Sequence, residues 1–210
     1  MSRQSAGFLE LNMAGIESCF LAIPIDEYQP QYASLVDQVG RINPDLVLGN
    51  PKIPHATTHY LGSLNSAQVA EIVSYASISA SHLSDTTLTI GGYGYETSGE
   101  SSRSSSLLHL PVHEDCGSLW NFRYELLSVL LAKQRQKSEK RRFALHVTLG
   151  YVRPNVLRSF QRAEQRIKEA MQAVSWSLRV KELALYGKVL GSPNTEIQRL
   201  ETIPLYPECN

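Results

Sequence analysis

Two short stretches of this chain repeat one another, residues 55–57 (His-Ala-Thr) and residues 146–148 (His-Val-Thr). Each lies in a segment typical of a β-strand, and each segment is followed by a stretch whose apolar residues have helical spacing. Strands and helices thus alternate twice in a similar order. The pattern predicts an α+β fold of two related lobes, each a mainly antiparallel sheet with helices packed outside. We expect the lobes to face one another across a central cleft.

The periodicity of apolar residues gives approximate bounds for the elements. We expect residues 1–16 to form a flexible N-terminal extension and residues 17–210 to form a single bilobal domain. Asn65 or Ser66 is a suitable N-cap for one of the helices. The predicted strands are 19–25, 53–62, 86–96, 106–114 and 143–152, followed by one closing strand within 175–190 and another at 197–203. The predicted helices are 31–42, 66–82, 116–133 and 156–174.

Charge and cysteine content exclude several classes of protein. The 210 residues carry 20 basic and 20 acidic side chains, so a uniformly basic nucleic-acid surface is not expected. The three cysteines form no CxxC motif, which argues against a disulfide framework and a thiolate zinc site. The first sixteen residues do not have the pattern of a secretory signal, and no stretch has the apolar length of a membrane span, so we expect a soluble cytoplasmic protein.

The two repeated strings place histidine and threonine side chains on one face of each strand. Alternate side chains of a strand share a face, so His55, Thr57 and His59 are expected on one side of the first strand. In the second strand His146 and Thr148 share a face, whereas Tyr151 is expected in the core. If the two strands meet, the cleft holds two imidazoles and two hydroxyls, a set suited to one phosphate group.

Hydrolysis of a phosphodiester needs a base to activate the nucleophile and an acid to protonate the leaving oxygen. Histidine, with an ordinary pKa of about 6.5, serves in either role near neutral pH. Threonine hydroxyls can hold the non-bridging oxygens in the transition state. This scheme requires no metal and no cofactor, and the sequence offers no obvious carboxylate cluster for a metal.

The paired His-x-Thr strings resemble the 2H phosphoesterase superfamily, which includes the 2′-5′ RNA ligase-like cyclic phosphodiesterases. The resemblance covers roughly residues 17–206, and the first string also continues into Tyr-Leu-Gly at residues 60–62. It implies that His55 and His146 are the catalytic pair and that Thr57 and Thr148 clamp the phosphate. One departure from the family pattern is Thr58, which replaces the usual apolar residue.

The expected function is therefore a metal-independent phosphodiesterase with two-histidine acid–base catalysis. Its expected substrate is a small nucleotide or an RNA end with a 2′,3′-cyclic phosphate or a 2′-5′ linkage, and we expect a monomer. The alternative is a non-catalytic module of the same fold that binds a nucleotide or an RNA end. The sequence does not choose the substrate, the bond that is cleaved or the histidine that acts as base.

Further candidates each have a structural alternative. His59 and Tyr186 are candidate substrate-binding residues, although His59 also suits a surface position at the cleft edge and Tyr186 a structural one. His109 is a candidate cleft residue in the middle of its strand. The basic run at 133–142 suits an RNA backbone, and it equally suits a solvated helix end.

Overall fold

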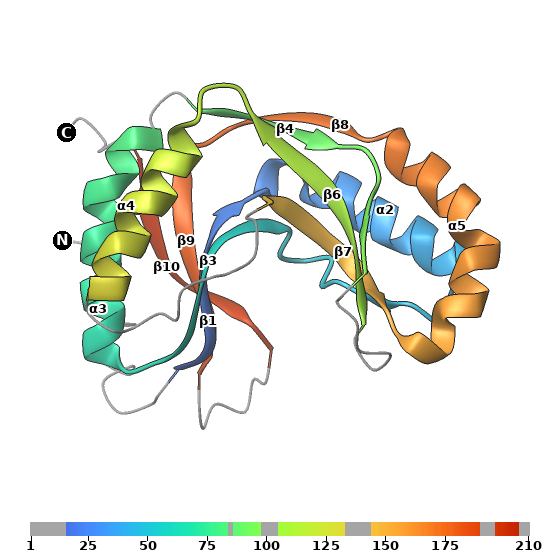
Figure 1. Cartoon of the computed structure of the whole chain (residues 1–210), viewed down its shortest axis with the longest axis horizontal. Helices are drawn as coiled ribbons and strands as arrows, with labels where there is room; N and C mark the ends of the chain where they lie inside the picture. The colour runs from blue at the N-terminus through green and yellow to red at the C-terminus, as the bar shows by residue number, and fades with distance from the viewer. Residues whose placement is uncertain (1–15, 84–85, 98–104, 133–143, 190–195, 206–210) are drawn as a thin grey trace.

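The computed structural model describes residues 16–83, 86–97, 105–132, 144–189 and 196–205 (Figure 1). In this part of the chain four α-helices accompany one curved, antiparallel sheet of ten strands. The strands are β1 (Ile16–Pro24), β2 (Val47–Leu48), β3 (His55–Leu64), β4 (Thr87–Gly91), β5 (Gly94–Glu96), β6 (Ser106–Glu114), β7 (His146–Val152), β8 (Ser175–Arg179), β9 (Glu182–Val189) and β10 (Gln198–Pro204). The helices are α2 (Gln29–Ile42), α3 (Ser66–Ser79), α4 (Ser118–Ala132) and α5 (Leu157–Gln172).

The sheet is divided into two lobes, as the alternation of elements predicts. The strand order is β10-β9-β1-β3-β7-β6-β4-β8, with β2 paired to β7 and β5 paired to β6. Helices α3 and α4 cover the outer face of the β10-β9-β1-β3 half, and α2 and α5 cover the other half (Figure 1). The expected α+β fold with helices outside is confirmed, and the two sheets prove to be continuous with each other.

The junction between the lobes is formed by the two strands that carry the repeated strings. β3 and β7 pair antiparallel at Ala56 and Val147, the central residues of the two strings. This single pair joins the β1-β3 half of the sheet to the β7-β6 half. Residues that are far apart in the sequence therefore meet at the centre of the molecule.

The central strand β1 is buried on both faces. Leu21 and Ile23 belong to the main core between the sheet and the helices. Phe20 and Ala22 point the other way and form a small apolar cluster with Ala184 and Tyr186 of β9. The side of the sheet that faces away from the main core thus has an apolar patch next to β3.

Local chemistry accounts for the helices. Asn65 caps α3, because its side chain accepts a hydrogen bond from the Gln68 N–H and the Gln68 side chain accepts one from the Asn65 N–H. In α5, Phe160, Ile167 and Met171 form the buried stripe. The predicted capping residue and the helical spacing are both confirmed.

Two predicted segments differ from the structure. Residues 86–96 form β4 and β5 as separate strands, because Gly91 and Gly92 turn the chain between them and Gly92 has a φ of 87°. Residues 175–190 contain β8 and β9, which lie in different lobes, since β8 pairs with β4 and β9 pairs with β1. The change of lobe depends on pairing with distant strands.

Two expectations fall on residues outside the described ranges. These are the N-terminal extension, of which only Ile16 is described, and the basic run at 133–142. They stay predictions. Among the described helices, none has the length and apolar character needed to cross a bilayer.

Candidate active site

The pairing of β3 with β7 places the two histidine–threonine strings on one face of the sheet. Because Ala56 opposes Val147, His55 lies beside Thr148 and Thr57 lies beside His146. The two histidines are diagonal neighbours across this pair, at a typical separation of roughly 7–8 Å. All four side chains are partly exposed, whereas Ala56 and Val147 between them are buried. His146 is close enough to His55 to exert a Coulombic effect on the pKa of that ring.

The two imidazoles are oriented in the same way. Nδ1 of His55 lies 2.7 Å from the carbonyl oxygen of Ile53, and Nδ1 of His146 lies 2.8 Å from that of Ala144. A carbonyl oxygen only accepts hydrogen bonds, so Nδ1 is the donor in each case. In both strings the carbonyl belongs to the residue two positions before the histidine. Nε2 of each ring is consequently the atom left to take or give a proton.

His55 rests on an aromatic platform. Its ring centroid lies 4.9 Å from that of Phe20 and 5.2 Å from that of Tyr186, with interplanar angles of 28° in both contacts. The Phe20 and Tyr186 rings are themselves stacked at 5.4 Å. Burial lowers the pKa of His55, and the nearby His146 lowers it further against the opposing effect of the Ile53 hydrogen bond. His55 is therefore neutral at neutral pH.

His146 has a different neighbour, the imidazole of His109 on β6. The two ring centroids are 4.9 Å apart, at an interplanar angle of 51°. His109 is buried, and burial lowers its pKa, with the Coulombic effect of His146 second. Gly94 leaves room for this ring, since a Cβ there would lie 2.3 Å from Nε2 of His109. The expectation that His109 lies near the cleft agrees with this contact, although His109 does not line the pocket.

A pocket of about 770 Å³ opens beside the two strings, although His146 is not among the residues that line it. His55, Thr57 and Thr148 line it, together with three tyrosines from different elements. The remaining lining residues come from β1, the end of β2, the β2–β3 connection and the residues before β10. The full set is Ser18, Phe20, Tyr32, Leu48, Gly49, Asn50, Pro51, Lys52, Ile53, His55, Thr57, Tyr60, Thr148, Tyr151, Glu196 and Ile197.

A β-bulge after the first threonine corrects the prediction for His59. Ala22 pairs with Thr57 and Leu21 pairs with His59, so Thr58 is an extra residue in β3 and the alternation of faces shifts by one. Thr58 donates its hydroxyl proton to the Leu21 carbonyl oxygen. His59 is completely buried, with Nε2 3.2 Å from the Arg123 carbonyl oxygen. It is not at the cleft face, and Tyr60 lines the pocket in its place.

The second strand has the same irregularity and corrects the prediction for Tyr151. His109 pairs with Thr148 and Leu108 pairs with Gly150, which makes Leu149 the extra residue of β7. The alternation again shifts by one, and Tyr151 points to the pocket instead of the core. The repeated string is thus His-x-Thr-x-x-Tyr in both copies, a signal present in the sequence that the shorter motif missed.

Tyr186 is also not where a substrate-binding residue should be. Only 1% of its surface is exposed, and it is absent from the pocket lining. It lies beside the His55 ring, in the apolar cluster with Phe20. Tyr186 is therefore better described as a structural residue, and its ring contacts His55, a candidate catalytic residue.

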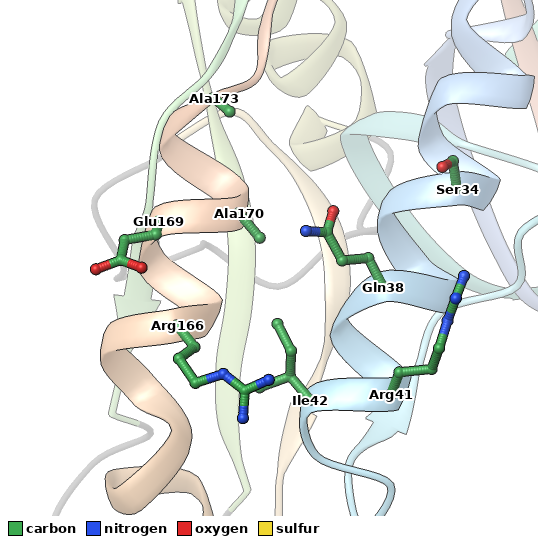
Figure 2. Close-up of a pocket in the computed structure, with 8 residues that line it drawn as sticks. All are labelled: Ser34, Gln38, Arg41, Ile42, Arg166, Glu169, Ala170 and Ala173. Carbon is green, nitrogen blue, oxygen red and sulfur yellow. The ribbon is translucent and has the colours of Figure 1, made fainter.

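A second hollow of about 750 Å³ lies between α2 and α5, away from the histidines. Figure 2 shows Gln38 of α2 and Arg166 of α5 pointing into the space between the helices. Arg41 at its edge forms an ion pair with Asp37 on the same helix. The hollow has no histidine or threonine, so it is not the candidate active site. Among the described residues, no three His, Cys, Asp or Glu side chains converge as metal ligands would.

Comparison with known proteins agrees with this geometry. No family model matches the sequence, and no curated protein matches it. Solved structures do match. TT0787 of Thermus thermophilus has a TM-score of 0.61 at 17% identity, and LigT of E. coli in complex with 3′-AMP has a TM-score of 0.53 at 19% identity. Each match covers 91% of this chain and 99% of the other.

The chain has the fold of LigT. A further structure described as a phosphoesterase matches with a TM-score of 0.52 at 19% identity, and it also covers 91% of this chain. The similarity to LigT confirms the fold expected from the resemblance to 2H phosphoesterases. At identities below 20% the similarity concerns the fold.

Proposed function

We propose that this protein is a metal-independent phosphodiesterase that hydrolyses a nucleotide or RNA-end phosphodiester. The expected bond is a 2′,3′-cyclic phosphate or a 2′-5′ linkage. One observation carries the proposal: on neighbouring strands, two imidazoles with Nδ1 held by the backbone share one face with two threonine hydroxyls. The fold shared with LigT, which is known in complexes with 3′-AMP and with NADP+, supports a nucleotide substrate.

The lowered pKa of His55 favours this residue as the general base. In the proposed reaction Nε2 of His55 takes a proton from water as the water oxygen attacks phosphorus. The bond from phosphorus to one ribose oxygen breaks, and protonated His146 gives its Nε2 proton to that oxygen. The product is a phosphomonoester, and exchange with solvent restores both histidines.

Thr57 and Thr148 are placed to hold the phosphate in this reaction. Each hydroxyl lies beside the histidine of the other string and can donate a hydrogen bond to a non-bridging oxygen. Such donors stabilise the charge that develops in the transition state, and they hold phosphorus in line between the two imidazoles.

Tyr60 and Tyr151 extend the site toward the rest of the substrate. Their side chains are 56% and 44% exposed, and both line the pocket. Aromatic faces of this kind stack on nucleobases without strong sequence preference. A pocket of about 770 Å³ is within the usual range for small-molecule sites, so it has room for a nucleotide.

The test is a turnover assay with the full chain and EDTA. The substrates are the four 2′,3′-cyclic nucleoside monophosphates and matched 2′-5′- and 3′-5′-linked dinucleotides, with chromatographic analysis of the products. We expect phosphomonoester products in the presence of the chelator. Loss of activity on adding EDTA would contradict the metal-independent scheme. Binding without turnover across the panel would support the alternative, a non-catalytic nucleotide- or RNA-end-binding module.

A further inference from the structure

Tyr186 connects His55 to an arginine on the neighbouring strand. The Cζ atom of Arg199 lies 5.7 Å from the centre of the Tyr186 ring, and one Nη2–H donates to the phenol oxygen at 3.2 Å. Burial raises the pKa of the Tyr186 phenol, so the oxygen carries no negative charge at neutral pH. The same ring contacts His55 at 5.2 Å.

Two carboxylates fix Arg199 in this position. Nη2 lies 2.5 Å from a carboxylate oxygen of Asp26, and Nη1 lies 2.8 Å from one of Glu182. The guanidinium therefore has partners on three sides, from the β1–α2 connection, from the start of β9 and from the Tyr186 hydroxyl. The Arg199 guanidinium therefore has little freedom to move, and its positive charge is held at a fixed distance from β3, the strand that carries His55.

We propose that Arg199 is a positioning residue for His55 and acts on it through the ring of Tyr186. This inference rests on the proposed function, since it assigns a role relative to the general base. Arg199 is absent from the pocket lining, so its effect on the reaction is indirect.

Two physical effects follow from the contacts. Arg199 holds the Tyr186 ring, and the His55 ring rests on that ring and on Phe20. In addition, the arginine charge disfavours a second positive charge on His55, because the buried ring of Tyr186 separates the two groups. Asp26 and Glu182 oppose this charge effect.

Other ionisable groups around His55 come from several elements. They are His146 on β7, Tyr186 on β9, Arg199 on β10, Asp26 and Glu182 beside Arg199, and Lys52 and Glu196 at the pocket rim. Arg199 is tied to the platform beneath His55 by both a hydrogen bond and a ring contact.

The experiment is an NMR titration of the histidine Cε1–H signals in the full chain, with His55 assigned from the spectrum of His55→Gln. In Arg199→Gln the titration midpoint of His55 should rise by roughly 0.3 to 1 pH unit, the range for a charge about 10 Å away. In Glu182→Gln it should fall, because the arginine charge is then less balanced. The signal of His146 should move less than that of His55 in both variants.

Lys181→Gln provides the matched control. Lys181 is an exposed cation just before β9 that pairs with Glu27 at 3.6 Å and has no contact with the platform among the interactions of the described residues. It should leave the His55 midpoint in place. Equal shifts in Arg199→Gln and Lys181→Gln would overturn the proposal, and so would shifts of the same sign in Arg199→Gln and Glu182→Gln. If Arg199→Gln does not fold, the His55 titration midpoints of Arg199→Lys and Glu182→Gln decide whether the proposal holds.

Kinetics separate this inference from the proposed function. On a substrate that is turned over, Arg199→Gln should move the acidic limb of kcat/KM to higher pH with little change in KM, and Arg199→Lys should restore the limb. An enzyme that turns over no substrate defeats the proposed function, yet the NMR titration still decides whether Arg199 acts on His55. An unchanged limb together with an unchanged midpoint would defeat the inference alone.

Discussion

The two strings occupy equivalent positions in the two lobes, but the packing behind them differs. In both, Nδ1 is bound to the carbonyl two residues earlier, a bulge follows the threonine, and a tyrosine lines the pocket. Behind His55 lie the two stacked rings of the platform, whereas His146 lies against another imidazole, that of His109. The repeated backbone thus sets the geometry, and burial behind the first ring lowers the pKa of His55.

The largest expected effect tests whether both halves are needed. His55→Ala and His146→Ala should each lower kcat/KM by ~10²–10⁴-fold on a cyclic phosphate, because each removes one proton transfer. On an ester with an activated phenol leaving group, His146→Ala should recover much of its activity, since that group needs no acid.

His113→Ala is the control for this pair, because His113 is exposed on β6 and lies outside the pocket. Its activity should match that of the unsubstituted protein. Recovery in His55→Ala instead of His146→Ala would reverse the assignment of base and acid.

The next effect concerns the two threonines. Thr57→Ala and Thr148→Ala should each lower kcat by about 10²-fold, the lower end for the loss of one donor to a developing charge. Thr57→Ser and Thr148→Ser keep the hydroxyl and should restore most of the activity.

Thr202→Ala, at an exposed position on β10, is the matched control and should have no effect. If the serine variants are as inactive as the alanine variants, the hydroxyls are not the phosphate donors.

The pocket tyrosines should affect substrate binding more than the chemical step. Tyr60→Leu and Tyr151→Leu should each raise KM about 10-fold, a value within the range for loss of one base–aromatic stack. Tyrosine-to-phenylalanine variants keep the ring, and their KM should stay close to that of the unsubstituted protein.

Tyr124→Leu, an exposed tyrosine on α4, is the control. A fall in kcat with unchanged KM in the two pocket variants would argue against stacking. A larger effect in one of the two variants would show which half of the cleft holds the nucleobase.

The smallest expected effect is a shift in pH dependence. Because burial lowers the pKa of His55, the acidic limb of kcat/KM should lie below the ordinary histidine value of about 6.5. Phe20→Ala exposes the ring to water and should move this limb upward by up to about one pH unit, the usual spread for histidines in proteins.

Phe20→Leu keeps the site apolar and should shift the limb less, as a pH–rate profile can measure. If Phe20→Ala leaves the limb unchanged, the platform does not control the protonation of His55.

The pattern of elements and the two short strings predicted much of the fold. The interleaved strands and helices indicated two lobes, and the apolar stripes and the Asn65 cap were found where expected. The histidines and threonines of the two strings lie on one sheet face because β3 pairs with β7. From the sequence alone this pairing is an assumption, since the sequence does not say which strands are neighbours. The assignment of catalysis to these residues stays a proposal.

The errors have a common physical cause. Alternation assigns side chains to faces only while a strand is regular, and the bulges at Thr58 and Leu149 break this rule. His59 consequently points into the core, and Tyr151 points into the pocket. A bulge is a mismatch between two paired strands, so it cannot be located without knowing the partner strand.

The sequence by itself determined which chemical groups this protein has and on which two strands they lie. Residue type and strand periodicity are local properties, and they suffice for that. The tertiary structure alone decided that Phe20 and Tyr186 lie beside His55 while His109 lies beside His146. These contacts depend on sheet order and register, which arise from pairing between segments distant in the chain.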